Sequence, residues 1–568
     1  MNTKRRPLPL QSLFFLIALM ALAAFIKFRH NPTGAYLLMG SDGPYSALQI
    51  RGLVENSRLA FPDMPLFFVL GAGLAKIFIW LHLASANESI LIALRWLDAL
   101  MPVLVAIPVY FICREAGNKT RSYFLFTCLI VAYSVFNFTP LVYFSYQLQK
   151  NASAVPLAFS YLYFMYRILK YEEKRDFIWA TLFLVLTLLL HFGSFALLIF
   201  FTVVIVLVRM MVVGRKTSRP AVAPYFLVGT ILLVLLIAVF DSTRFLRLVA
   251  IPAKIFEMPV ILVNANGKNL ILQGMRLWHL IATHLFTGYA LLLFIRNWKK
   301  TEPANRVMGM AMIVLALFCA SPLLGLEWAN RLYMMSYIPI TILYAILFNL
   351  PLSPWLKRIP AAFFLVLIMQ STGVAWLQPR LMSISREAYR ELDSLKTHSV
   401  LSPSATVSAR QDLRLLASWI FHTRGAADYK ITAADFTLPG GLYVLTQIAG
   451  SHLPKDRMRE VEIHEGFEDI FQGSYFRLYK LTSSAGWRFG KSEPPRAVGN
   501  VVSVGQNQFL LSAGMERIVE YSSTTEMKFL QPGDSIRPQM KVEVYGSWQP
   551  FSTCVTADLI YELPGDSP

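Results

Sequence analysis

Long apolar runs constrain the fold of this chain more than any other feature. Runs of roughly 20 residues, enough to cross about 30 Å of hydrocarbon, occur near residues 10–28, 62–83, 91–112, 122–140, 153–170, 222–240, 277–295, 306–323, 331–349 and 360–378. A longer run, 177–212, is interrupted by His191-Phe192-Gly193-Ser194, which predicts two short spans that meet at a polar turn. The pattern predicts an α-helical polytopic membrane protein.

The charge distribution supports this class. Hydrophobic residues make up 55% of the chain and charged residues only 15%, with a mean hydropathy of +0.49, whereas soluble domains are about a quarter charged. Residues 380–568 carry 20 basic and 21 acidic side chains, and residues 1–379 carry 33 and 13. The basic excess therefore belongs to the apolar part and indicates positive-inside loops, not binding to nucleic acid.

The basic loops also predict an orientation. A basic, acid-free segment from Arg209 to Arg219 marks the cytoplasmic side, and Lys4-Arg5-Arg6 indicates a cytoplasmic N-terminus. These two basic segments give the same orientation only if 62–83 does not cross the membrane. The start of this run, Phe61-Pro62-Asp63-Met64-Pro65, also suits a spanning helix poorly, because each proline lacks a backbone donor. We expect about eleven spans. An alternative in which 62–83 spans and 177–212 is one helix stays open.

Three regions are expected along the chain. Residues 1–379 form the transmembrane domain, with a long first external loop at 29–90. Residues 380–485 form an extracytoplasmic α/β domain, with helices at 384–397 and 411–423 and strands at 405–409, 442–447, 459–464 and 474–482. Residues 486–568 form a small β-rich module, with strands near 500–512, 515–522, 540–546 and 554–562.

The predicted orientation leaves few acids outside: Asp42, Glu55, Asp63, Glu88, Asp98, Asp241, Glu257 and Glu327. Asp42 lies in the turn sequence Gly40-Ser41-Asp42-Gly43-Pro44. One interpretation is that it caps a helix that starts near Pro44. The other is a functional carboxylate at the membrane boundary, where partial desolvation strengthens a general base. The following amphipathic helix, which includes Tyr45, suits an interfacial position.

These features resemble the GT-C superfamily of polyprenyl-phosphate-sugar-dependent membrane glycosyltransferases, which includes oligosaccharyltransferase catalytic subunits, protein O-mannosyltransferases and aminoarabinose transferases. The resemblance covers about residues 8–378. It rests on Asp42 at the start of the first external loop, Tyr45 and its helix, the proline-led helix after Phe61, residues 94–122, His191-Phe192-Gly193-Ser194, and Glu327-Trp328-Ala329-Asn330-Arg331 before Tyr337-Ile338-Pro339.

The resemblance implies an inverting transferase that takes a sugar from a polyprenyl-linked donor outside the cytoplasm. Asp42 would be the catalytic base or position the acceptor, and Arg331 would hold the donor phosphate. Further candidates for binding the donor phosphate or lipid are Lys150, Arg244 and Arg247. Candidates for binding the substrate are Tyr45, Gln147, His191 and Glu327. For His191, a structural hydrogen-bonding role at the helix break stays open.

No cofactor is predicted. Oligosaccharyltransferases carry an acidic pair for a metal in the second external loop, whereas residues 143–151 here contain no acid, so a divalent metal is not supported. The expected partners are the polyprenyl-linked sugar donor, membrane lipids, and a protein, lipid or polysaccharide acceptor. The expected location is a bacterial plasma membrane, with the C-terminal domain outside. The acid-free loop also leaves open a non-catalytic flippase or binding subunit of an envelope glycan assembly.

Overall fold

The computed structural model describes residues 10–30, 42–117, 121–144, 148–213, 241–262, 275–377, 384–398, 404–409, 411–426, 440–448, 466–482, 496–512, 516–529, 535–549 and 552–563, with isolated residues between these ranges. The chain divides into two compact units. One comprises Met1–Leu198 and Leu352–Glu493, and the other comprises Ile199–Pro351 and Pro494–Pro568. Each unit combines apolar helices with a β-sheet region.

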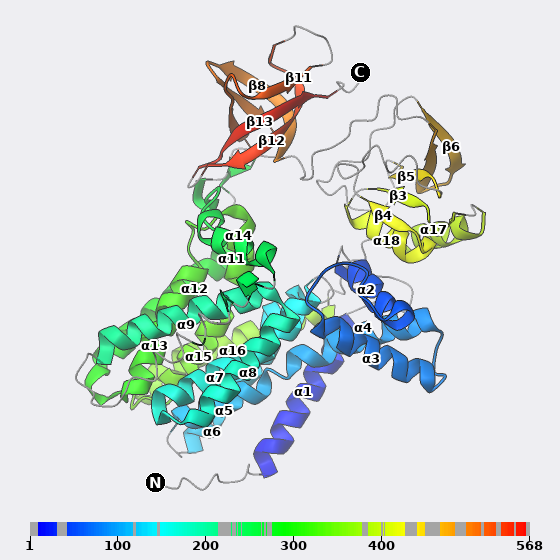
Figure 1. Cartoon of the computed structure of the whole chain (residues 1–568). Helices are drawn as coiled ribbons and strands as arrows, with labels where there is room; N and C mark the ends of the chain where they lie inside the picture. The colour runs from blue at the N-terminus through cyan, green and yellow to red at the C-terminus, as the bar shows by residue number, and fades with distance from the viewer. Residues whose placement is uncertain are drawn as a thin grey trace. The chain divides into compact units, whose positions relative to one another are not determined.

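The first unit contains most of the N-terminal helices, coloured blue to cyan in Figure 1. They are α1 (Leu10–His30), α2 (Asp42–Asn56), α3 (Leu66–Trp80), α4 (Ala86–Val103), α5 (Ala106–Ala116), α6 (Arg121–Phe136), a π-helical turn (Thr139–Tyr143), α7 (Gln149–Tyr171) and α8 (Lys174–Leu190), joined by α16 (Pro354–Leu377). Helix α7 is central because it packs against α4, α5 and α8, while α16 packs against α1 and α6.

Five described helical stretches are long and apolar enough to cross a membrane: Leu10–His30, Ala86–Ala116, Phe124–Tyr143, Phe192–Val212 and Pro354–Leu377. The chain is thus an integral membrane protein. Helix α3, in the predicted external loop, has only 15 residues, or about 22 Å at 1.5 Å per residue. That 62–83 does not cross stays a prediction. The predicted span 222–240 lies largely outside the described residues.

Two predicted runs contain helix breaks. The run at 91–112 divides into α4 and α5 after Pro102, where the amides of Leu104 and Val105 bond to carbonyls three residues back. The predicted break at His191 is confirmed: α8 ends at Leu190, His191 is extended with φ −154° and ψ 112°, and α9 (Phe192–Val213) follows. Helix α9 passes from the first unit into the second.

The second unit holds α11 (Ser242–Lys254), α12 (Met275–Arg296), α13 (Pro303–Cys319), α14 (Leu326–Met335) and α15 (Tyr337–Leu347). Its strands are β8 (Ala497–Gly505), β9 (Gln508–Ser512), β10 (Glu516–Glu520), β11 (Glu526–Lys528), β12 (Lys541–Trp548) and β13 (Cys554–Glu562). They form one sheet in the order β10-β9-β8-β12-β13-β11, and a further pairing of β10 with β13 closes it into a small barrel.

The first unit also contains a five-stranded sheet of order β4-β3-β5-β7-β6. Its strands are β3 (Thr406–Ser408), β4 (Arg424–Ala426), β5 (Leu442–Gln447), β6 (Phe467–Gln472) and β7 (Phe476–Leu481). Helices α17 (Arg386–His398) and α18 (Gln411–Phe421) pack on it.

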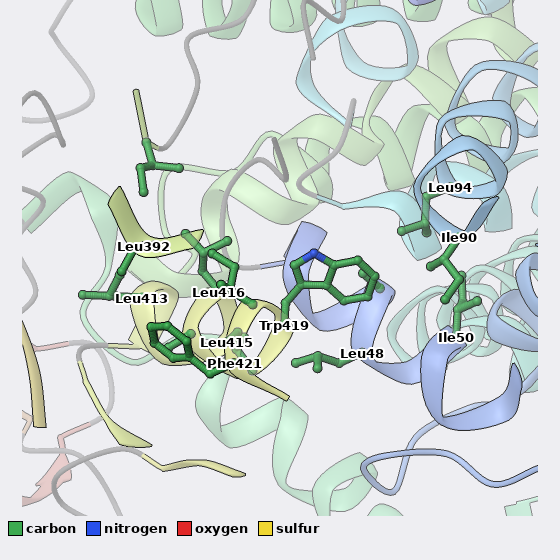
Figure 2. Packing of buried hydrophobic residues seen from close by; sticks show 14 of the residues in the cluster. Leu48, Ile50, Ile90, Leu94, Leu392, Leu413, Leu415, Leu416, Trp419 and Phe421 are labelled. Carbon is green, nitrogen blue, oxygen red and sulfur yellow. The ribbon is translucent and has the colours of Figure 1, made fainter. Parts of the chain in front are cut away.

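Helix α2 is largely buried between other elements of the first unit. It packs against α3, α4 and α18, and Figure 2 shows Trp419 of α18 beside Leu48 of α2. The guanidinium of Arg51 lies 4.0 Å over the Trp419 ring and donates a hydrogen bond to the Trp419 carbonyl at 2.6 Å. Burial lowers the pKa of Arg51 to about 10. The position of α2 is therefore fixed by α3 and α4 and also by α18.

Candidate functional site

A carboxylate in the segment between α2 and α3 joins three elements of the first unit. Asp63 forms an ion pair with Lys150, the second residue of α7, and accepts a hydrogen bond of 2.7 Å from the hydroxyl of Tyr45 on α2. Its other oxygen accepts the Met64 backbone N–H at 2.7 Å. The side chains of Asp63 and Lys150 are 18% and 22% exposed. We call Tyr45, Gln49, Asp63 and Lys150 the Asp63 cluster.

Gln49 fixes the loop that carries Asp63. Its amide nitrogen donates to the Phe61 carbonyl at 3.0 Å and to the Tyr45 hydroxyl at 2.9 Å, while its amide oxygen accepts the Phe61 N–H at 2.9 Å. The ring of Phe61 also stacks on the ring of Tyr45, with centroids 5.7 Å apart. Gln49 is completely buried, so these hydrogen bonds replace those that water would supply.

The cluster favours the ionised form of Asp63. Burial is the largest single influence and would raise the pKa of its carboxyl. The charge and hydrogen bond of Lys150, together with the hydrogen bonds from Tyr45 and Met64, outweigh burial and hold the pKa below its ordinary value of 3.8. The ammonium of Lys150 also lies 5.3 Å from the Tyr45 ring centroid and 5.4 Å from that of Phe68, where a cation interacts favourably with the ring.

The N-terminal end of α7 has polar groups without partners among the described residues. Both amide atoms of Gln149 and the hydroxyl of Ser153 are buried and make no hydrogen bond there. No acid lies in the first turn, and Leu148 supplies no side-chain cap. Because a helix N-terminus exposes backbone N–H groups and a partial positive charge, this end can attract an anion. Buried polar groups without a partner are uncommon in folded proteins.

The structure brings two of the predicted site residues, Tyr45 and Lys150, together around Asp63. Asp42 is the first residue of α2, so the helix begins two residues before the predicted start at Pro44. The side chain of Asp42 lies outside the described residues, and so does all of Gln147. Their roles stay predictions.

His191 contacts the start of α9. Its Nδ1 accepts the backbone N–H of Ser194 at 3.0 Å and lies 2.9 Å from the Ser194 hydroxyl. An Nδ1 that accepts an N–H leaves the proton of the neutral ring on Nε2. This geometry favours the structural reading of His191, in which the ring satisfies a backbone donor at the helix break.

The other candidates belong to the second unit. Arg331 is an exposed residue of α14, and it forms no ion pair with a carboxylate of the described residues. Arg244 forms an ion pair with Asp241 at 2.7 Å, and Asp241 also caps α11 by accepting the Arg244 N–H at 3.0 Å. Arg244 is thus already engaged locally. The side chains of Glu327 and Arg247 lie outside the described residues.

Sequence reasoning placed Asp63 outside the cytoplasm without giving it a role at the site. The available signal was an acid between two prolines, Pro62 and Pro65, at the start of an apolar helix. Its partners lie 18 and 87 residues away, so no local pattern identifies them. Among the residues that the structure describes, no three His, Cys, Asp or Glu side chains are grouped so that they could hold a metal ion.

No protein-family profile matches the chain, and no curated protein matches it by sequence. Among solved structures, the chain is similar to the crystal structure of ArnT from Cupriavidus metallidurans in the apo state. The identity is 11%, the TM-score is 0.38, and the match covers 85% of this chain and 100% of that chain. A similarity of this size says nothing of activity or substrate.

Proposed function

We propose that the chain is a membrane glycosyltransferase of the GT-C kind, which moves a sugar from a polyprenyl-phosphate or polyprenyl-diphosphate donor to an acceptor on the extracytoplasmic side. The observation that carries the proposal is the Asp63 cluster. It ties α2, which begins at Asp42, to the end of α7 that carries Lys150. The cluster thus holds the helix that begins at Asp42 against a cation that can serve the donor.

The donor phosphate is assigned to the N-terminal end of α7. An ammonium group has three donors, and Asp63 is the one carboxylate that Lys150 contacts among the described residues. The remaining donors and the backbone N–H groups of the first turn suit phosphate oxygens. The Gln149 amide, which lacks a partner in the described chain, is a further group for the phosphate or the sugar.

The acceptor is assigned to Asp42. Asp42 precedes Tyr45 by three residues on α2, the spacing that places two residues on one helical face. The acceptor nucleophile bonds to the anomeric carbon as the bond from that carbon to the phosphate oxygen breaks, which inverts the configuration. The acceptor proton passes to Asp42, and the carrier leaves as polyprenyl phosphate or diphosphate.

The proposed orientation has eleven spans, a cytoplasmic N-terminus and an extracytoplasmic C-terminal part, in a bacterial plasma membrane. It rests on the alternation of basic loops. Under this orientation α2 and the N-terminal end of α7 lie at the extracytoplasmic side, where a lipid-linked donor can enter laterally from the outer leaflet. The role of Arg331, which belongs to the second unit, stays a prediction from the sequence.

The test measures polyprenyl phosphate released by the full chain in lipid nanodiscs that contain polyprenyl-phosphate-linked sugars. We expect Asp42→Asn to slow release by at least about 100-fold, the typical contribution of a general base. Glu55→Gln is the matched control, because Glu55 is an exposed acid near the end of the same helix. Equal release by wild type and a folded, donor-binding Asp42→Asn variant would show that Asp42 is not the base.

A non-catalytic flippase or binding subunit is the second candidate, and the acid-free loop at 143–151 favours it. Such a protein binds the donor through Lys150 and releases no polyprenyl phosphate with any acceptor. Donor binding without turnover in the wild-type chain would select this candidate.

A further inference from the structure

A second feature of the first unit lies far along α7 from the Asp63 cluster. A groove of about 590 Å³ opens between α5, α7 and α8. Its walls are mainly aromatic, with Phe111 of α5, Tyr163 and Phe164 of α7, and Trp179 and Phe183 of α8. Arg175, near the start of α8, also lines it and is the one cation that does so.

Three of the lining residues lie in a row along α8. Arg175, Trp179 and Phe183 are four residues apart, so they form one stripe along the helix and extend over about 12 Å. Phe164 stacks on both aromatic rings of this stripe, with centroid distances of 6.1 Å to Trp179 and 5.7 Å to Phe183. The result is an apolar groove with a cation at one end of its α8 wall, an arrangement that suits an acyl chain below a charged headgroup.

The surrounding surface of α8 is apolar and exposed. Ile178 is 70% exposed, Trp179 43% and Leu182 41%. In an integral membrane protein, exposed apolar side chains of this kind face lipid, and tryptophan beside a basic residue is typical of the membrane–water interface. The basic loop at Lys170 to Arg175 marks this end as cytoplasmic in the predicted orientation.

Arg175 has no ion-pair partner among the described residues, because the acids near it pair with another arginine. The nearby acids Glu115, Glu173 and Asp176 all pair with Arg167, and Arg175 makes no ion pair or hydrogen bond with the described residues. An unpaired guanidinium at the end of an apolar groove is complementary to a phosphate on an acyl-bearing lipid.

We propose that this groove is a binding site for an anionic phospholipid of the cytoplasmic leaflet. One acyl chain lies along Phe164, Trp179 and Phe183, and the headgroup phosphate accepts hydrogen bonds from Arg175. The site is independent of the proposed transfer reaction, since it uses none of the residues of the Asp63 cluster.

The test compares phosphatidylglycerol and phosphatidylcholine with identical acyl chains, bound to the detergent-purified full chain and counted by native mass spectrometry. We expect the wild-type chain to retain about fivefold more phosphatidylglycerol, the effect of one basic residue near an anionic lipid. Arg175→Gln removes this preference. Lys174→Gln, which removes the neighbouring charge outside the groove, preserves it.

The acyl chain is tested separately. Trp179→Ala is expected to lower retention of both lipids, whereas Ile178→Ala, at an exposed apolar position beside it, leaves both unchanged. The proposal is overturned if the wild type shows no preference, if the two charge variants behave alike, or if the two apolar variants behave alike. Selective retention of polyprenyl phosphate at Arg175 over phosphatidylglycerol would also overturn it, by assigning the groove to the carrier lipid.

Discussion

The two ends of α7 differ in how many carboxylates surround their basic side chain. At the C-terminal end, Arg167 is 9% exposed and contacts three carboxylates: Asp176 and Glu115 at 2.9 Å and Glu173 at 3.5 Å. At the N-terminal end, Lys150 is 22% exposed and contacts the single carboxylate of Asp63. One helix thus carries an ion cluster rich in acids at one end and a sparsely paired cation at the other.

The two ends also differ in how many of their polar groups have hydrogen-bond partners among the described residues. The guanidinium of Arg167 contacts all three acids. The Tyr171 hydroxyl donates a hydrogen bond to the Glu115 carboxylate, and the Lys170 ammonium donates one to the Glu115 backbone carbonyl, both at 2.6 Å. Such a network holds α5, α7 and α8 together. At the other end, the ammonium of Lys150 contacts only one carboxylate of the described residues. The Gln149 amide and the Ser153 hydroxyl are buried and have no hydrogen-bond partner in the described chain. In the proposed function, a bound ligand would supply these hydrogen bonds.

Arg167→Met should produce the largest loss of stability. It leaves three acids clustered without their central cation, and removal of one partner from a buried ion network typically costs about 3–5 kcal/mol. Thermal unfolding of the full chain in detergent measures the effect. Lys174→Gln, at the exposed first residue of α8, should change stability by less than about 0.5 kcal/mol. A similar small change for Arg167→Met would contradict a structural role for that network.

Asp63→Asn should cost less, about 2 kcal/mol near pH 7, because it weakens one charge-assisted pair at a partly exposed site. The pKa of Asp63 is lowered in the folded chain. Its stabilising contribution is therefore complete above its ordinary pKa of 3.8 and is lost as the pH falls through the folded value. The difference in unfolding temperature between wild type and Asp63→Asn should shrink below about pH 4; a constant difference down to pH 2 would exclude the ion pair as its source.

Gln149→Leu should have the smallest effect on stability, neutral or slightly stabilising. It removes a buried amide that lacks partners in the described chain, and such a replacement spares the cost of desolvating a polar group. The same variant should bind polyprenyl phosphate several-fold more weakly, which titration in nanodiscs measures. Strong destabilisation with unchanged binding would instead mean that the amide has a structural partner.

The sequence predicts helices and strands well where the pattern is local. The break at His191 follows from a polar tetrapeptide in an apolar run, and β5 and β13 occupy the predicted ranges. The predicted strand at 500–512 is instead a hairpin of β8 and β9, with Asn507 in the left-handed region at φ 58°. Strand β6 was not predicted because its exposed face gives it no apolar alternation. The predicted strand at 459–464 lies outside the described residues.

The candidate site was predictable only in part. Tyr45 and Lys150 were selected by residue type and predicted side of the membrane, and both belong to the Asp63 cluster. Asp63 itself contacts Tyr45 of α2, 18 residues away, and Lys150 of α7, 87 residues away. The burial of Gln49 depends on how α2 packs against α3, α4 and α18. Such contacts are tertiary, and neither periodicity nor charge alternation encodes them.

Binding of polyprenyl phosphate to the full chain in nanodiscs tests the central claim most directly. Lys150 and Lys170 lie on the same helix at opposite ends, so Lys150→Gln and Lys170→Gln form a matched pair, and Lys150→Arg retains the charge. We predict that Lys150→Gln weakens binding at least about tenfold, as expected for a charge-assisted phosphate contact. Lys170→Gln should bind like wild type, and Lys150→Arg should largely restore binding. Equal affinities for folded Lys150→Gln and Lys170→Gln would contradict the assignment of the donor phosphate to this end of α7.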